Sequence, residues 1–152
     1  MWRLIVLTLL LTGCGSSPTA APPVTSPPRP SAAKVTVGAE NVSLTISDRA
    51  GDFVCGKAHA EWHFVESAGL GARLTHSDVY LLEKDGDVTE RVVADRSDRI
   101  EANGQLRLNY DRVAACGIEG NEYPPTAKGL FTVVDDAGNT LSLTAEAVLI
   151  EK

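Results

Sequence analysis

The sequence is poor in aromatic residues, in methionine and in basic side chains. Aromatic residues make up 5% of its 152 positions, and methionine occurs once. A platform that stacks nucleic-acid bases and a methionine-rich copper carrier both need more of these residues. Acidic side chains outnumber basic ones by 20 to 14, so the formal net charge is −6 and phosphate backbones are repelled. We therefore expect no nucleic-acid partner.

The chain also lacks the short motifs of common catalytic and nucleotide-binding sites. It contains no GxSxG nucleophile elbow, no GxxxxGK[ST] phosphate loop and no GxGxxG dinucleotide motif. The serines near the histidines, Ser67 and Ser77, have no turn signature that would strain and expose a hydroxyl. We predict that the protein is not an enzyme, and we expect no cofactor.

The apolar run at the N-terminus is too short to span a membrane. It extends from Leu4 to Leu11 behind Arg3, whereas a spanning helix needs ~20 apolar residues. A short apolar run that follows a basic residue and precedes small residues is typical of a secretory signal peptide. Residues 1–13 are therefore predicted to be a signal peptide.

The residues that end this run resemble a known processing site. Leu11, Thr12, Gly13 and Cys14 are similar to the lipobox of bacterial lipoproteins, in which a branched residue and two small ones precede a cysteine. The resemblance implies cleavage before Cys14, a diacylglyceryl group on its thiol and anchorage of the protein in a membrane of the cell envelope. Gly15 stands where an Asp tends to retain lipoproteins in the inner membrane, so the outer membrane is favoured. In an organism with a single membrane, the resemblance implies that the protein lies on the outer face of that membrane.

Residues 14–33 combine the lipidated cysteine with a proline-rich stretch. Six of the eight prolines fall between positions 15 and 33, together with small residues and a single charge at Arg29. Such a composition buries too little apolar area to offset the entropy of ordering, and proline favours extended chain. We predict a disordered tether that reaches up to ~60 Å at ~3.1 Å per residue. A proline-rich ligand for an aromatic groove is the alternative.

From position 34 to position 152 the dominant period of the sequence is two. Apolar and polar residues alternate, and Asp-Gly and Asn-Gly pairs separate the alternating segments. This pattern predicts antiparallel strands joined by hairpin turns. About eight strands are expected, over residues 34–38, 41–47, 57–66, 72–82, 87–94, 98–108, 126–134 and 140–151.

A set of strands of this size in one domain fits an all-β sandwich of two antiparallel sheets. Trp62, on the apolar face of its strand, is expected at the centre of the core. The domain loosely resembles immunoglobulin-like and fibronectin type III-like domains. The spacing from Tyr110 to Cys116 does not match the immunoglobulin tyrosine corner, which places the tyrosine two residues before the cysteine.

The three cysteines fit an exported protein. With Cys14 lipidated, Cys55 and Cys116 are the remaining pair, and the compartment outside the cytoplasm favours a disulfide between them. Such a bridge closes a loop of ~60 residues and contributes ~4 kcal/mol in the chain-entropy model. A reactive or metal-binding thiol pair is the alternative, although neither cysteine lies in a CxxC motif.

His59, Glu61 and His63 are the best candidates for a metal site. They share the polar face of one strand, but His59 and His63 lie ~13 Å apart at ~3.3 Å per residue, so a site needs a ligand from a neighbouring strand, with His76 as a candidate. The alternative is an ordinary solvated strand face, and we expect no metal. Two acidic turns, at 85–87 and 135–139, offer oxygen ligands for calcium, but hairpin chemistry explains both equally.

Two loops are candidates for recognition at the ends of the sandwich. The first covers residues 66–72 and contains two glycines, and the second covers residues 115–125, where Ile118 and Tyr123 offer an apolar anchor. A connection stapled by Cys116, with no partner, is the alternative for the second loop.

The sequence as a whole indicates a lipid-anchored module outside the cytoplasm that binds an envelope partner or plays a structural role. Two alternatives stay open. One is a small metal-dependent or hydrolytic enzyme that uses His59 and Glu61, and the other is an accessory subunit of an envelope complex or an inhibitor of an extracellular enzyme. Three convergent titratable groups in a cavity favour the enzyme, and an exposed apolar patch favours the subunit or inhibitor.

Overall fold

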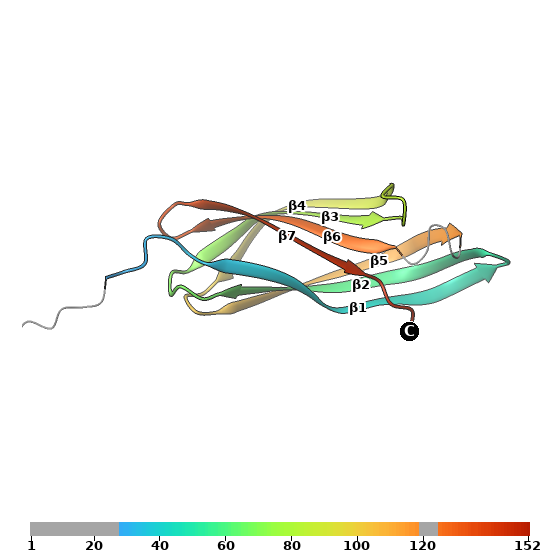
Figure 1. Cartoon of the computed structure of the whole chain (residues 1–152), viewed down its shortest axis with the longest axis horizontal. Helices are drawn as coiled ribbons and strands as arrows, with labels where there is room; N and C mark the ends of the chain where they lie inside the picture. The colour runs from blue at the N-terminus through green and yellow to red at the C-terminus, as the bar shows by residue number, and fades with distance from the viewer. Residues whose placement is uncertain (1–27, 119–124) are drawn as a thin grey trace, which may run out of the picture.

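The residues that the structure describes form seven strands. These strands make a β-sandwich, whose two layers are seen in Figure 1. The computed structural model describes residues 28–118 and 125–152, without the side chains of residues 112–115. One sheet has the order β1-β2-β5 and the other the order β4-β3-β6-β7, and every ladder is antiparallel. The predicted all-β, two-sheet architecture is thereby confirmed. The strands are β1 (Val35–Ala50), β2 (Phe53–Glu66), β3 (Ala72–Leu82), β4 (Val88–Ile100), β5 (Gln105–Ile118), β6 (Thr126–Asp135) and β7 (Thr140–Val148).

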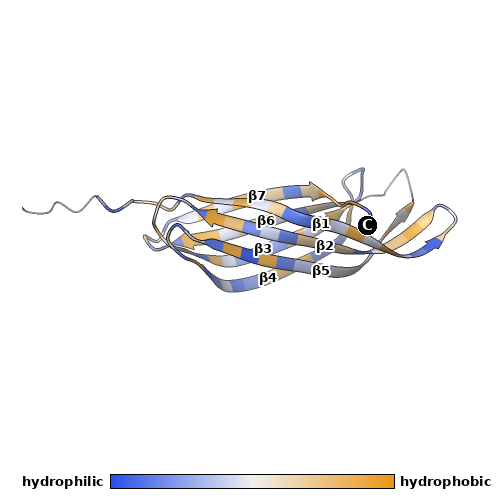
Figure 2. Cartoon of the chain, turned by 90° about the horizontal axis from the view of Figure 1, so that it is seen from below, coloured by the Kyte–Doolittle hydropathy of each residue, from blue (hydrophilic) through white to orange (hydrophobic). Residues whose placement is uncertain are grey.

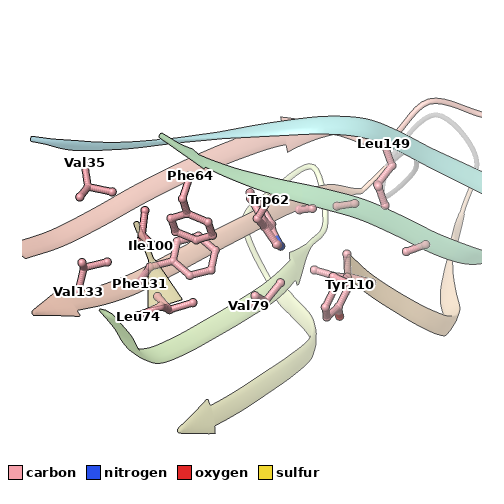
Figure 3. Packing of buried hydrophobic residues seen from close by; sticks show 14 of the residues in the cluster. Val35, Trp62, Phe64, Leu74, Val79, Ile100, Tyr110, Phe131, Val133 and Leu149 are labelled. Carbon is pink, nitrogen blue, oxygen red and sulfur yellow. The ribbon is translucent and has the colours of Figure 1, made fainter. Parts of the chain in front are cut away.

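Alternation along each strand produces the core. In β2, the even-numbered positions from Val54 to Glu66 are buried and the odd-numbered ones face outward. Three aromatic side chains from the two sheets meet between them (Figure 3): Phe131 packs edge-on against Trp62 at 5.4 Å and against Phe64 at 4.9 Å between ring centroids. Burial of each such ring contributes ~1.5 to 3 kcal/mol, and edge-to-face pairs add a further ~0.5 to 1.5 kcal/mol. Trp62 therefore lies in the core centre that the sequence predicts.

Gly129 has no side chain, and the aromatic cluster fills the space that a side chain at this position would need. A Cβ atom at position 129 would overlap the ring of Phe131 and lie 3.3 Å from Trp62 Cζ2. Gly129→Ala should therefore lower the free energy of unfolding by about 1 to 3 kcal/mol, because the packed rings must shift. Gly38→Ala in β1 is the matched control, since nothing lies within 4 Å of its added Cβ. Urea denaturation measures both, and an equal effect of the two substitutions would contradict this packing.

The first two predicted strands, 34–38 and 41–47, are one strand. β1 runs unbroken from Val35 to Ala50, with a register shift between Glu40 and Ser43 and with Asn41 at a φ of 49°. This β-bulge inserts an extra residue and moves the inward positions from odd to even numbers, which looks like two strands in the sequence. The prediction of a break was therefore wrong.

The predicted strand 98–108 was also wrong, because it spans a turn. β4 ends at Ile100 and β5 begins at Gln105, and the N–H of Gly104 donates to the carbonyl of Glu101 at 2.8 Å between them. β5 then continues to Ile118, so the first part of the predicted loop 115–125 is strand. Residues 119–124 of that loop, including Tyr123, lie outside the described residues.

The sandwich has two different ends. The chain joins the fold at one end, beside the turns that follow β2, β4 and β6, and we call this the tether end. The β1–β2 hairpin and the end of β5 lie at the opposite end, where the three-stranded sheet extends beyond the other (Figure 1). We call that end the tip. Among the described residues, no helix is long and apolar enough to cross a membrane.

Candidate functional site

The buried carboxylate of Glu66 fastens the tether end. Its side chain is 1% exposed and receives four backbone hydrogen bonds. Oε1 accepts from the N–H groups of Lys34 (3.2 Å) and Ala68 (2.7 Å), and Oε2 accepts from those of Gly69 (3.0 Å) and Asn103 (2.8 Å). Burial alone raises the pKa of Glu66, but these donors, led by Asn103, hold the pKa below its ordinary value. One side chain thus ties the first residues of the domain to two loops.

Asp135 fastens the same end from the other sheet. Its Oδ2 accepts from the N–H of Ala33 at 2.9 Å and from Asn139 Nδ2 at 2.9 Å, and its Oδ1 accepts from the N–H groups of Ala137 and Asn139. Asn139 Nδ2 also donates to the carbonyl of Ser31 at 3.1 Å. Ala33 is buried, although the sequence places it in the tether. Glu66 and Asp135 together form what we call the carboxylate clamp.

The clamp should make the stability of the fold depend on pH in the acidic range. The Asn139 side chain, followed by the N–H of Ala33, lowers the pKa of Asp135 from 3.8 to about 2. A lowered pKa means that the stabilisation is complete above pH 4 and is lost as the pH falls toward 2. Asp135→Asn should lower the melting temperature at pH 6 and flatten its decline between pH 4 and pH 2. Circular dichroism melts measure this, with Asp52→Asn in the exposed β1–β2 turn as control, and an unchanged acid profile in Asp135→Asn would contradict the role of the clamp.

The tip carries the disulfide and an exposed apolar pair. Cys55 in β2 and Cys116 in β5 lie directly opposite each other and are joined, with 4.1 Å between their Cα atoms. Two positions further out, Phe53 is 50% exposed and stands opposite Ile118, which is 43% exposed. These two side chains point to the outer face of the three-stranded sheet, beside the disulfide. We call Phe53 and Ile118 the apolar tip pair.

Sequence reasoning found only part of this tip. Ile118 was predicted as an anchor and the disulfide was predicted from the cysteine count, but Phe53 was missed because β2 was expected to begin at residue 57. The segment from Phe53 to Cys55 alternates in phase with the rest of the strand, so its pattern contained a usable signal. Figure 2 shows hydrophobic colour on the projecting β1–β2 arm.

The three candidate metal ligands each have a partner of their own. His59 Nδ1 donates to Asp111 at 2.7 Å, and His63 contacts Glu40 through Nδ1 at 2.8 Å. His63 Nε2 faces Gln105 Oε1 at 3.0 Å, so both ring nitrogens of this histidine are engaged with oxygen atoms. The candidates therefore lie on one face, as predicted, but their atoms point to neighbouring strands rather than to a common centre.

Glu61 belongs to an ion-pair network on the same face, and this network reaches His63 through Glu40. It pairs with Arg107 of β5 and accepts from Asn41 Nδ2 at 3.3 Å, and Arg107 also reaches Glu40 at 2.9 Å. Arg107 is the main cause of a lowered pKa at Glu61, and His63 is the main cause at Glu40. Both carboxylates are therefore held ionised by protein partners, which explains the face as a charged surface of the sheet.

His76 does not supply the neighbouring-strand ligand that the sequence suggested. It lies in β3 of the other sheet and contacts Asp95 at 3.2 Å. Within residues 28–118 and 125–152, no three His, Cys, Asp or Glu side chains are grouped so that they could hold a metal ion. The acidic turns serve hairpins: Asp85 accepts from the N–H of Asp87, and Gly138 has a φ of 89° in the β6–β7 turn.

The outer face of the four-stranded sheet has a shallow depression of about 290 Å³ with a mixed polar and apolar lining. Asp78 lies in it and is held by two hydrogen bonds from Arg91 at 2.9 and 2.7 Å and by one from Tyr80 at 2.7 Å. The Arg91 contact is the main cause of the lowered pKa of Asp78. Ser77, which the sequence does not mark as a nucleophile, donates to the carbonyl of Ala94 in β4 and accepts from Arg96.

Comparison with known proteins finds relatives in structure only. No family model matches the chain, and no curated protein matches it. A structural-genomics target designated SoR45 superposes with a TM-score of 0.56 at 11% identity, over 78% of this chain and 86% of its own. A Bordetella pertussis protein assigned as ApaA superposes with a TM-score of 0.52 at 13% identity, over 78% of this chain and 94% of its own. These likenesses show the fold alone.

Proposed function

We propose that this protein is a lipid-anchored binding module of a bacterial cell envelope, held outside the cytoplasm. In this proposal a lipid on Cys14 anchors the chain, residues 15–30 act as a tether that ends where Ser31 and Ala33 are fastened to the sandwich, and the sandwich presents its tip to a protein partner of the envelope. Gly15 favours the outer membrane as its location. The module carries out no catalysis of its own.

The observation that carries the proposal is the opposite placement of the clamp and the tip. Glu66 and Asp135 fix the first residues of the domain at one end, and the apolar tip pair lies at the other end. A chain anchored through its N-terminus then holds Phe53 and Ile118 away from the lipid surface. Exposed apolar side chains on a rigid support are typical of recognition sites.

The ion pairs on the polar faces weigh against the enzymatic alternative. His59, Glu61 and His63 are each bound to partners on adjacent strands, so they do not converge on a space for a substrate. The exposed apolar tip pair instead fits the accessory subunit or inhibitor that the sequence leaves open. Both of these are binding roles, and both use the same tip.

Site-specific crosslinking in intact cells tests this role. A photo-reactive phenylalanine analogue at position 53 of the full chain should form an adduct with an envelope protein. The same analogue at Val93 is the matched control, because Val93 is 51% exposed on β4 of the other sheet. An adduct at position 53 that is absent at position 93 supports the proposal, whereas no adduct, or the same adducts at both positions, contradicts it.

A further inference from the structure

β7 forms one margin of the four-stranded sheet (Figure 2), and β1, the margin of the other sheet, packs close to it without forming a ladder with it. All ladder partners of Thr140–Val148 belong to β6. The backbone hydrogen bonds to β1 come from the chain beyond β7. There the carbonyl of Ile150 accepts from the N–H of Leu44, and the N–H of Lys152 donates to the carbonyl of Leu44. Alternate N–H and C=O groups along β7 therefore face outward without a strand partner. An edge of this kind is a template for a further strand.

The other three edge strands carry devices that prevent such pairing. β1 has two register shifts, and the tail from Ile150 to Lys152 covers part of its edge. β4 has two register shifts and six charged residues, and β5 has a register shift and the charges of Arg107 and Asp111. β6–β7 alone among the five described ladders runs without a shift, and Glu146 is the one charged residue of β7. Bulges and charges are the usual protection of an edge, and β7 has no bulge and only a single charge.

We propose that β7 pairs antiparallel with β7 of a second copy of this chain. When the two strands overlap over their full length, the two-fold axis passes at Thr144. Thr144 then stands opposite its own copy, Ser142 opposite Glu146, and Leu143 opposite Ala145. The two four-stranded sheets become one continuous sheet of eight strands.

The sequence of β7 is self-complementary in this register. Glu146, which is paired with Lys128 at 2.5 Å, meets a serine rather than another acid, so no like charges oppose each other. A threonine pair forms on the axis, and paired threonines in a sheet are favourable. The inward side chains match a leucine with an alanine, which continues the apolar layer across the axis. A closed two-fold contact of one surface with itself is the commonest form of oligomer.

The geometry of the pair has a consequence for anchoring. Antiparallel pairing places the two tether ends at opposite ends of the dimer, and each tip lies near the tether end of the other copy. On the proposed lipid anchor, tethers that each extend up to ~50 Å allow both chains to be anchored in one membrane while the dimer, and with it each tip, stands clear of the lipid surface. The pairing itself rests on β7 and does not depend on the anchor.

Disulfide crosslinking of the full chain in the membranes of the producing cell tests the register. Opposite Cα atoms in antiparallel strands lie ~4.5 to 5.5 Å apart, within the range that a disulfide spans. Thr144→Cys should give a crosslinked dimer on a non-reducing gel. Ser142→Cys and Glu146→Cys are matched controls: each alone should give none, because identical positions lie ~13 Å apart, whereas the two produced together should crosslink.

Charge substitutions in the Thr144→Cys background supply the second arm. Ser142→Glu places two like charges opposite Glu146 in each dimer, and Ser142→Lys places two opposite charges there. We expect roughly tenfold more crosslinked dimer with lysine than with glutamate. Crosslinking of Thr144→Cys to a different protein, no crosslinking of a folded chain, or equal crosslinking at positions 142, 144 and 146 would each overturn the pairing. If the proposed lipid anchor alone is absent, the chain in detergent should still give the same pattern of crosslinked dimers. Failure of the anchor is thereby distinguished from failure of the pairing.

Discussion

Replacing Cys55 and Cys116 together by alanine is expected to lower the free energy of unfolding by about 4 kcal/mol. The disulfide joins residues 61 positions apart, and opening it returns the entropy of a long closed loop to the unfolded chain. The loss is a large share of the ~5 to 15 kcal/mol that stabilises a domain of this kind. Denaturant titration of the double variant and of the unsubstituted chain measures the difference.

Reduction of the disulfide is the matched control for this prediction. The unsubstituted chain in excess dithiothreitol should unfold at the same denaturant concentration as the double variant. Hydrogen exchange should rise most at the outer part of the β2–β5 ladder, where Phe53 stands opposite Ile118, because the bridge holds these strand ends together. A double variant as stable as the oxidised chain would show that the bridge contributes no stability.

Glu66→Gln is expected to be the second most damaging substitution, with a loss of about 3 kcal/mol. The carboxylate accepts four backbone hydrogen bonds at a site that is 1% exposed. Glutamine keeps the size but replaces one acceptor oxygen with an NH₂ donor, so buried N–H groups lose their acceptor and the stabilising negative charge is removed. Denaturant titration measures the loss of stability.

A local measurement separates this clamp from a general loss of packing. Hydrogen exchange in Glu66→Gln should rise first at the N–H groups of Lys34, Ala68, Gly69 and Asn103, which donate to the carboxylate. Glu101→Gln at the same end is the matched control, since its side chain is 75% exposed and its change should stay under about 0.5 kcal/mol. Equal stability of the two variants would contradict the role of Glu66.

The alternation in the sequence was enough to predict the class of fold. Inward Ala58, Ala60, Trp62 and Phe64 define one face of a strand, and Asp-Gly and Asn-Gly turns mark antiparallel connections. The sheet order was not predictable, because pairing depends on contacts between residues far apart in the chain. The bulge at Asn41 was misread for a local reason: an inserted residue shifts the period without any change in composition.

The carboxylate clamp was missed for a different reason. Glu66 and Asp135 end their strands beside loops, where acidic residues are ordinary, so only the fold reveals that backbone N–H groups converge on them. The sequence predicted that His59 and His63 lie on the polar face of one strand. Their partners come from β5 and β1, so identifying them required the register of the β1–β2 and β2–β5 ladders. The disulfide followed from counting cysteines, because two remained after Cys14 was assigned to the lipid.

Lipidation of Cys14 underlies the proposed role, and mass spectrometry of the N-terminal peptide of the protein isolated from membranes detects it. We expect a mature chain that begins at Cys14, with a diacylglyceryl group on the thiol. A Cys14→Ala variant should retain its leader or leave the membrane. A chain that begins at Met1, carries an unmodified Cys14 and is recovered in the cytoplasm would show that the protein is not a lipoprotein.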